Sequence, residues 1–153
     1  MWEELIQKAV TQLDYAYAPY SDFKVGAALL CKDGRIFTGC NIENSAYGPS
    51  NCAERTAIFK AVSEGVREFK AIAIVGGKHG EIRDYCAPCG VCRQVMAEFC
   101  EPAEFQIIMA KSPEDYQVCT LAGLLPKAFS PKILASGQNM ESISRGTLEV
   151  EPE

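Results

Sequence analysis

Residues 24–42 read KVGAALLCKDGRIFTGCNI, and this stretch decides the fold. Its two largely apolar runs, residues 24–31 and 36–42, predict two strands. Asp33-Gly34 stands between them, and Asp-Gly is a strong signal for a tight hairpin turn. The stretch therefore predicts a β-hairpin within a sheet.

Helices and strands are predicted on either side of this hairpin. Residues 2–16 carry apolar side chains at helical spacing and predict an amphipathic helix. The sequence after the hairpin predicts, in order, a helix over 52–64 capped by Ser50 or Asn51, a buried strand over 70–76, a helix that begins near Pro88, strands over 105–110 and 116–120, and a helical turn over 121–125. This order predicts an α/β layered domain with one mixed sheet.

The length of 153 residues fits one compact domain, and an apolar share of 48% is enough for a sizeable core. Residues 136–153 contain Ser, Glu and Gly and show little apolar periodicity. We therefore expect a single domain over residues 1–135, followed by a poorly ordered tail over 136–153.

The formal net charge of −5 argues against a nucleic-acid partner, which requires a dense Lys/Arg surface, and favours a small or weakly charged ligand. The N-terminus lacks the basic start and the apolar run of a secretory signal. No stretch approaches the ~20 apolar residues that span a bilayer. We therefore expect a cytoplasmic protein with no membrane partner.

Clustered cysteines point to metal binding or redox chemistry, because the chain has no secretory signal. Of the eight cysteines, only Cys86, Cys89 and Cys92 lie close together in the sequence. In Cys89-Gly90-Val91-Cys92 two thiols share one face of a predicted helix start, where the helix dipole favours thiolates that bind Zn²⁺. The pair alone is not specific, since a redox dithiol or a buried pair without function fits equally well.

A second candidate half-site is Cys52-Ala53-Glu54, also at a predicted helix start. A cysteine and a carboxylate two residues apart do not share a helix face, but both can border a site beyond the helix N-terminus. Three protein ligands, Cys52, Cys89 and Cys92, leave a tetrahedral zinc one open position, which is the mark of a catalytic site. The alternative is Cys86 as a fourth ligand, which makes the zinc structural.

Several motifs in order resemble the small cytidine deaminase family, which includes a variant with three cysteine ligands. The resemblance covers roughly residues 5–130. It is carried by residues 23–29 (FKVGAAL), 39–44 (GCNIEN), 52–57 (CAERTA), 88–94 (PCGVCRQ) and 124–129 (LLPKAF).

The resemblance implies a three-layer fold with a central five-stranded mixed sheet flanked by helices. It also implies zinc-dependent hydrolysis of the nucleosides cytidine and 2′-deoxycytidine to uridine and 2′-deoxyuridine, with release of ammonia, as in pyrimidine salvage. Members with three cysteine ligands are homotetramers with shared active sites, and we expect the same assembly here.

Roles for individual residues follow from the same resemblance. Glu54 takes a proton from the zinc-bound water and passes it to N3 of the cytosine ring. It next delivers a proton to the amino group, which departs as ammonia. Three thiolates on Zn²⁺ leave a net charge of −1, which two helix N-termini and hydrogen bonds from Arg55 to the sulfurs offset.

Asn41 lies at the end of the strand predicted over residues 36–42, and Glu43 follows it. An amide beside a carboxylate suits a sugar hydroxyl as donor and acceptor. The resemblance places this pair on the ribose 3′-OH, whereas turn chemistry is the alternative. It also implies four further substrate contacts: Phe23 on the pyrimidine ring, the Ala53 N–H on the base, and Tyr47 and Phe129 in a neighbouring subunit's pocket.

Other functions remain open from the sequence alone. A related zinc deaminase acting on a free base, a nucleotide or an antibiotic nucleoside is the nearest alternative, and a polynucleotide editor is disfavoured by the charge. A protein that uses zinc only to stabilise its fold and a thiol oxidoreductase using Cys89 and Cys92 belong to other classes. His79, the one histidine, lies in a Gly-rich loop and is expected to be exposed and not a ligand.

Overall fold

The structure is a computed structural model that describes residues 1–134. The predicted domain boundary at residue 135 and the predicted tail over 136–153 lie outside the described residues.

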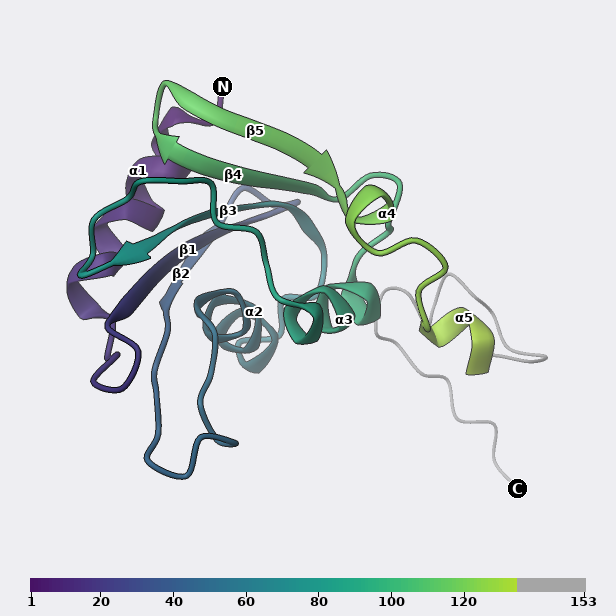
Figure 1. The fold of residues 1–153 in the computed structure, drawn as a ribbon. Coiled ribbons are helices and arrows are strands. Elements are labelled where there is room, and N and C mark those ends of the chain that lie inside the picture. Colours follow the sequence, from purple (N-terminus) through teal and green to yellow (C-terminus); the bar gives the residue numbers. More distant parts are fainter. Residues whose placement is uncertain (135–153) are drawn as a thin grey trace.

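Five strands form one mixed sheet in the order β2-β1-β3-β4-β5 (Figure 1). They are β1 (Phe23–Cys31), β2 (Ile36–Cys40), β3 (Phe69–Lys78), β4 (Gln106–Ser112) and β5 (Asp115–Thr120). β3 and β4 run parallel, and the other neighbouring pairs are antiparallel. The predicted hairpin over residues 24–42 is present as β1 and β2, with Ala27 paired to Gly39.

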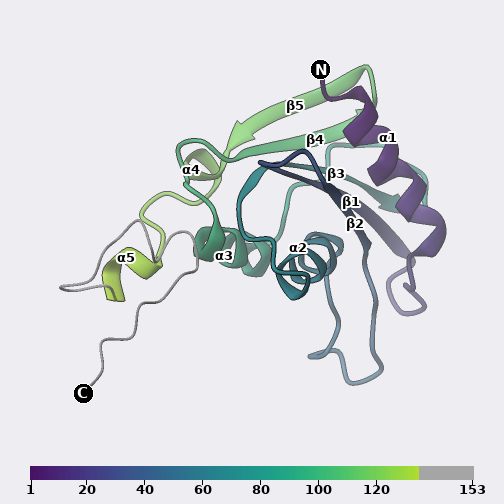
Figure 2. The same ribbon diagram turned by 180° about the vertical axis from the view of Figure 1, so that it is seen from behind.

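Helices cover both faces of the sheet, which makes three layers. α1 lies on one face, and α2 and α3 lie on the other (Figures 1 and 2). The helical elements are α1 (Glu3–Thr11), the 3-10 helix η1 (Gln12–Tyr15), α2 (Ala53–Ser63), α3 (Gly90–Phe99), α4 (Leu121–Leu124) and α5 (Pro131–Leu134). Within residues 1–134, no helix is long and apolar enough to cross a membrane.

The alternation of side chains along β3 divides the core in two. Ile72 and Ile74 belong to the cluster that contains α2 and α3, whereas Ala71, Ala73 and Val75 belong to the cluster that contains α1. Successive side chains of a strand point to opposite faces, so a strand covered on both faces is apolar throughout. This explains the unbroken apolar run over residues 71–75.

Two predicted boundaries differ from the structure. The second strand ends at Cys40, not at Ile42, since the Asn41 side chain binds the β1 backbone and the chain turns away. The first helix is α-helical only to Thr11, after which residues 12–15 tighten into a 3-10 turn.

The start of α2 also differs from the prediction. The N-cap is Cys52, and no side-chain hydrogen bond caps the helix start. The Ser50 hydroxyl accepts a hydrogen bond from the Asn44 N–H at 3.0 Å, and the Asn51 amide donates to the Thr56 hydroxyl at 3.2 Å. The short helix α5 was not predicted.

A glycine lets α2 lie directly on the sheet. A Cβ atom at Gly39 of β2 would stand 2.5 Å from the Ala53 carbonyl oxygen and 2.6 Å from the Ala57 nitrogen. Only glycine permits so close an approach of two backbones. The first turn of α2 is thereby held against the β2 end of the sheet.

Candidate active site

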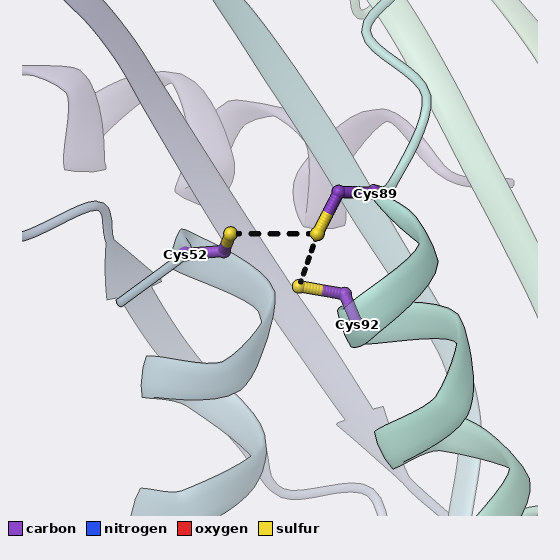
Figure 3. Close-up of side chains that lie close together, drawn as sticks. All are labelled: Cys52, Cys89 and Cys92. Atoms are coloured by element: carbon purple, nitrogen blue, oxygen red, sulfur yellow. Dashed lines mark hydrogen bonds between the residues drawn. The ribbon is translucent and has the colours of Figure 1, made fainter. Parts of the chain in front are cut away.

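The first turns of α2 and α3 lie next to each other on the same face of the sheet (Figure 3). Cys52 is the N-cap of α2 and Cys89 is the N-cap of α3, while Cys92 lies in the first turn of α3. All three thiols point into the space between the two helix ends (Figure 3). The backbone N–H groups at both ends favour negative charge there.

The spacing of the three sulfurs suits a tetrahedral metal ion. Cys52 Sγ is 3.7 Å from Cys89 Sγ, and Cys89 Sγ is 3.6 Å from Cys92 Sγ. Zn–S bonds of about 2.3 Å at tetrahedral angles put two sulfurs about 3.8 Å apart. The sulfurs all lie within 4.8 Å of one another, and these residues can hold a metal ion.

The thiol cluster already favours one thiolate. Hydrogen bonds from Cys92, Arg55 and Cys89 lower the pKa of the Cys52 thiol to about 5, against the opposing effect of burial. The hydrogen bond to Cys52, together with burial, raises the pKa of Cys92 above its ordinary range. A divalent cation would supply the positive charge that full ionisation of the cluster requires.

Arg55 lies beside the sulfurs. Its Nη2 donates to Cys52 Sγ at 3.3 Å. Burial lowers the pKa of the guanidinium, but hydrogen bonds with Cys52 and Cys92 outweigh it and raise the pKa overall. Its Nε is buried and has no hydrogen-bond partner within residues 1–134. This arrangement suits a cluster of thiolates, which needs a permanent positive charge nearby.

Glu54 is a buried carboxyl group in the first turn of α2. Its exposed fraction is 3%. Burial raises its pKa to about 7, although a hydrogen bond with Cys92 works in the opposite direction. A group whose pKa lies near neutrality can both accept and donate a proton at physiological pH.

A cavity of about 280 Å³ opens beside the sulfurs. Its lining combines the end of the β1–β2 hairpin, the start of α2 and the segment before α3. The lining residues are Val25, Asn41, Glu43, Ser50, Asn51, Cys52, Glu54, Arg55, Cys86, Ala87 and Cys89. The predicted acid, two predicted metal ligands and the predicted ribose pair therefore meet at one cavity.

Asn41 has a structural contact at each end of its amide. Its Oδ1 accepts from the Val25 N–H at 2.9 Å, and its Nδ2 donates to the Phe23 carbonyl at 2.7 Å. The residue is 9% exposed, so it is not a free turn residue. The remaining amide hydrogen and lone pair still leave one donor and one acceptor.

Glu43 also lines the cavity, and its carboxylate accepts hydrogen bonds from the turn before β1. The donors are the Tyr20 N–H, the Ser21 N–H and the Ser21 hydroxyl, and the hydroxyl bond keeps the pKa of Glu43 below its ordinary value. Glu43 is thus a charged acceptor in a set position.

The other four predicted contacts lie outside the lining of this cavity. Phe23 begins β1 and is 40% exposed, and Ala53 is buried as the first residue of α2. Tyr47 is 71% exposed and makes an edge-on ring contact with Tyr20, while Phe129 is 56% exposed. A residue that contacts a neighbouring subunit must be exposed on the single chain, and Tyr47 and Phe129 meet this requirement. Their roles in a neighbouring pocket remain predictions.

Some residues of the cavity lining had no role in the predicted site, and Cys86 had only the alternative role of a fourth ligand. Cys86 lines the cavity but is not part of the three-sulfur group, and burial raises its pKa to about 12. The Cys86 sulfur is not among the three that lie within 4.8 Å of one another, which is the observation against its role as a fourth ligand. Its place in the cysteine cluster was the one available signal, whereas nothing in the local sequence marks Val25 or Ser50.

Known proteins resemble this chain in sequence. A family model described as the cytidine and deoxycytidylate deaminase zinc-binding region matches residues 2–109. The cytidine deaminase of Sporosarcina psychrophila is 52% identical over 133 residues, which cover 87% of this chain and 94% of that protein. The enzyme of Halalkalibacterium halodurans is 51% identical over 126 residues, or 82% and 92% of the two chains.

Solved structures of cytidine deaminases also resemble this chain. The crystal structure of cytidine deaminase from Burkholderia pseudomallei matches with a TM-score of 0.75 and 49% identity, covering 82% of this chain and 97% of that one. The Mycobacterium tuberculosis enzyme matches with a TM-score of 0.71 and 41% identity, covering 84% and 96%. The predicted fold class and the family resemblance are confirmed. This chain belongs to the cytidine and deoxycytidylate deaminase family.

Proposed function

We propose that this protein is a zinc-dependent enzyme that hydrolyses cytidine and 2′-deoxycytidine to uridine and 2′-deoxyuridine, with release of ammonia. Membership of the family supports an enzyme that deaminates cytidine. The observation that carries the mechanism is a buried glutamate beside three converging thiols at one cavity.

Cys52, Cys89 and Cys92 would hold Zn²⁺. Their sulfur spacing fits the ion, and the exclusion of Cys86 from the group leaves one position of a tetrahedron free. When bound, the ion lowers the pKa of a water molecule to about 7 and so supplies the nucleophile at neutral pH. Arg55 would offset the excess negative charge of three thiolates.

Glu54 would move the protons. Its carboxylate would accept a proton from the attacking water and deliver it to N3 of the cytosine ring. It would then take the proton of the new hydroxyl group at C4 and pass it to the amino group, which departs as ammonia while the C4 carbonyl forms. Burial suits this cycle because it brings the affinity of Glu54 for a proton close to neutrality.

The cavity beside Glu54 would take the nucleoside. Asn41 and Glu43 would bind the ribose 3′-OH as donor and acceptor, the Ala53 N–H would contact the base, and Phe23 would pack against the pyrimidine ring. A 3′-oxygen that is esterified can no longer donate to Glu43. A nucleotide within a polynucleotide is therefore a poor substrate.

A homotetramer with shared active sites would complete the cavity. Phe129 and Tyr47 are large, exposed side chains, and both would be buried on assembly in a neighbouring pocket. Sedimentation velocity tests the assembly, because a monomer at assay concentration would contradict it.

Cytoplasmic pyrimidine salvage would be the setting of this reaction. All eight cysteines are free thiols, and free cysteines are usual in a reducing compartment.

The decisive experiment follows the ultraviolet change as cytidine becomes uridine. We expect activity, about one zinc ion per chain, and loss of activity with a chelator that returns when zinc is restored. Active protein without zinc would contradict the metal centre. Reversible oxidation of Cys89 and Cys92 in a protein that lacks deaminase activity would favour a thiol oxidoreductase instead.

A further inference from the structure

We propose that Ser21 is a positioning residue that holds the carboxylate of Glu43 for the sugar hydroxyl. The inference rests on the proposed ribose contact of Glu43. Ser21 lies outside the lining of the cavity and would act on the substrate through Glu43.

The Glu43 carboxylate is oriented by one turn of the chain. Oε1 accepts from the Tyr20 N–H at 2.9 Å and from the Ser21 N–H at 3.1 Å, while Oε2 accepts from the Ser21 hydroxyl at 2.6 Å. Both oxygens are held, so the plane of the carboxylate is set and not only its position. The hydroxyl bond is the shortest of the three, as expected for a donor to a charged oxygen.

The Ser21 hydroxyl is itself oriented. Its oxygen accepts from the Phe23 N–H at 3.0 Å, at the first residue of β1. A serine hydroxyl has a single hydrogen to donate. That hydrogen goes to Glu43, which favours the charged carboxylate and lowers its pKa. Glu43 is thereby kept as an acceptor, the role that a sugar hydroxyl donor needs.

The end of the central strand β3 holds this turn in place. Lys78 Nζ donates to the Ser21 carbonyl at 2.7 Å, and the His79 N–H donates to the Asp22 carbonyl at 2.7 Å. The His79 ring also pairs with the Asp22 carboxylate. Asp22 and His79 both have left-handed backbone conformations, with φ of 54° and 58°.

These contacts make one connected path from the sheet to the cavity. The strand end at Lys78 and His79 fixes the turn at Ser21 and Asp22, and the turn fixes Glu43. A carboxylate that is already oriented loses little freedom when the substrate binds, which strengthens binding. Removal of the Ser21 hydroxyl should therefore weaken substrate binding more than it slows the chemical step.

The test compares Ser21→Ala, Ser21→Thr and Glu43→Gln in the full-length, zinc-loaded protein. For Ser21→Ala we expect KM for cytidine to rise about tenfold, as loss of a hydrogen bond to a charged group implies. We expect kcat to stay within about twofold because the contact is made equally in the ground and transition states. Ser21→Thr keeps a hydroxyl and should restore KM. Ser63→Ala is the matched control, since that hydroxyl donates to the Lys60 carbonyl about 15 Å along α2 from Ala53.

Two comparisons separate positioning from a general loss of structure. With 3′-deoxycytidine, which has no hydroxyl for Glu43 to bind, Ser21→Ala should leave KM unchanged. In a Glu43→Gln background, Ser21→Ala should add little further, because residues that act as one unit are not additive. An equal loss on 3′-deoxycytidine, or full additivity with Glu43→Gln, would overturn the proposal.

The same data distinguish this proposal from the proposed function. If Glu43→Gln raises KM and Ser21→Ala does not, the positioning role is wrong and the ribose contact stands. If Glu43→Gln leaves KM for cytidine unchanged, the ribose contact is wrong and the role of Ser21 is overturned with it. Neither result bears on the metal centre or on Glu54. Zinc content tests the metal centre separately, and kcat tests the role of Glu54.

Discussion

Replacement of Gly39 by alanine tests whether contact between two backbones sets the metal centre. Gly39 lies in β2, and the first turn of α2 packs on it. The new Cβ would be 2.5 Å from the Ala53 carbonyl oxygen, 2.6 Å from the Ala57 nitrogen and 2.9 Å from Thr56 Cβ. Ordinary contact begins at roughly 3.5 Å, so α2 and β2 must separate locally by about 1 Å.

The expected cost follows from two opposing effects. Overpacking of this kind costs about 1–3 kcal/mol, and here two of the three atoms in the way belong to a helix backbone that cannot rotate aside. Alanine also restricts the unfolded chain more than glycine does, which stabilises the folded state by only about 0.4–1 kcal/mol. The clash dominates, and we expect Tm to fall by roughly 3–10 °C.

Activity should fall further than stability. Ala53 stands between Cys52 and Glu54, so the shift that relieves the clash also displaces a predicted ligand and the predicted acid. A misplacement of about 1 Å costs about 10²-fold in rate. We therefore expect kcat/KM for cytidine to fall by about that factor, with a lower zinc content.

The assay combines three measurements on the folded variant: Tm by circular dichroism, the ultraviolet rate with cytidine, and zinc by elemental analysis. Gly48→Ala is the matched control, because a Cβ there meets nothing within 4 Å. Parental values of Tm, rate and zinc content for Gly39→Ala would refute the reasoning. They would mean that the site tolerates displacement of α2 from the sheet.

Three further substitutions test individual side chains of the site. Glu54→Gln should lower kcat by about 10²–10⁴-fold and leave the zinc content at the parental value, whereas zinc lost together with activity would show that the carboxylate stabilises the centre instead of moving protons. Cys86→Ser should keep both zinc and activity, because this thiol lies outside the three-sulfur group; a drop in zinc content would make it a ligand. Arg55→Gln should weaken zinc binding by about 10–100-fold in competition with a chelator, and an unchanged affinity would remove the guanidinium from charge compensation.

The local sequence was sufficient for most of the elements and for two of the three predicted metal ligands. The hairpin over residues 24–42 follows from its turn and its apolar runs, and β3 follows from an apolar run too short for a helix. The pairing of Cys89 with Cys92 follows from helical geometry alone, because residues three apart lie on the same face. Such features depend on neighbours within a few residues, so they can be predicted without the fold.

The tertiary structure decided the rest, because it brings together residues that are far apart in the chain. Cys52 and Cys89 are separated by 37 positions, and their sulfurs meet only because α2 and α3 pack on the same face of one sheet. The burial that raises the pKa of Glu54, the choice of Cys52 over Ser50 as the N-cap, and the hold of Ser21 on Glu43 across 22 positions arise in the same way. Each depends on which groups exclude water or offer a hydrogen bond at one point in space. That information is distributed over several elements, so no single stretch of the sequence contains it.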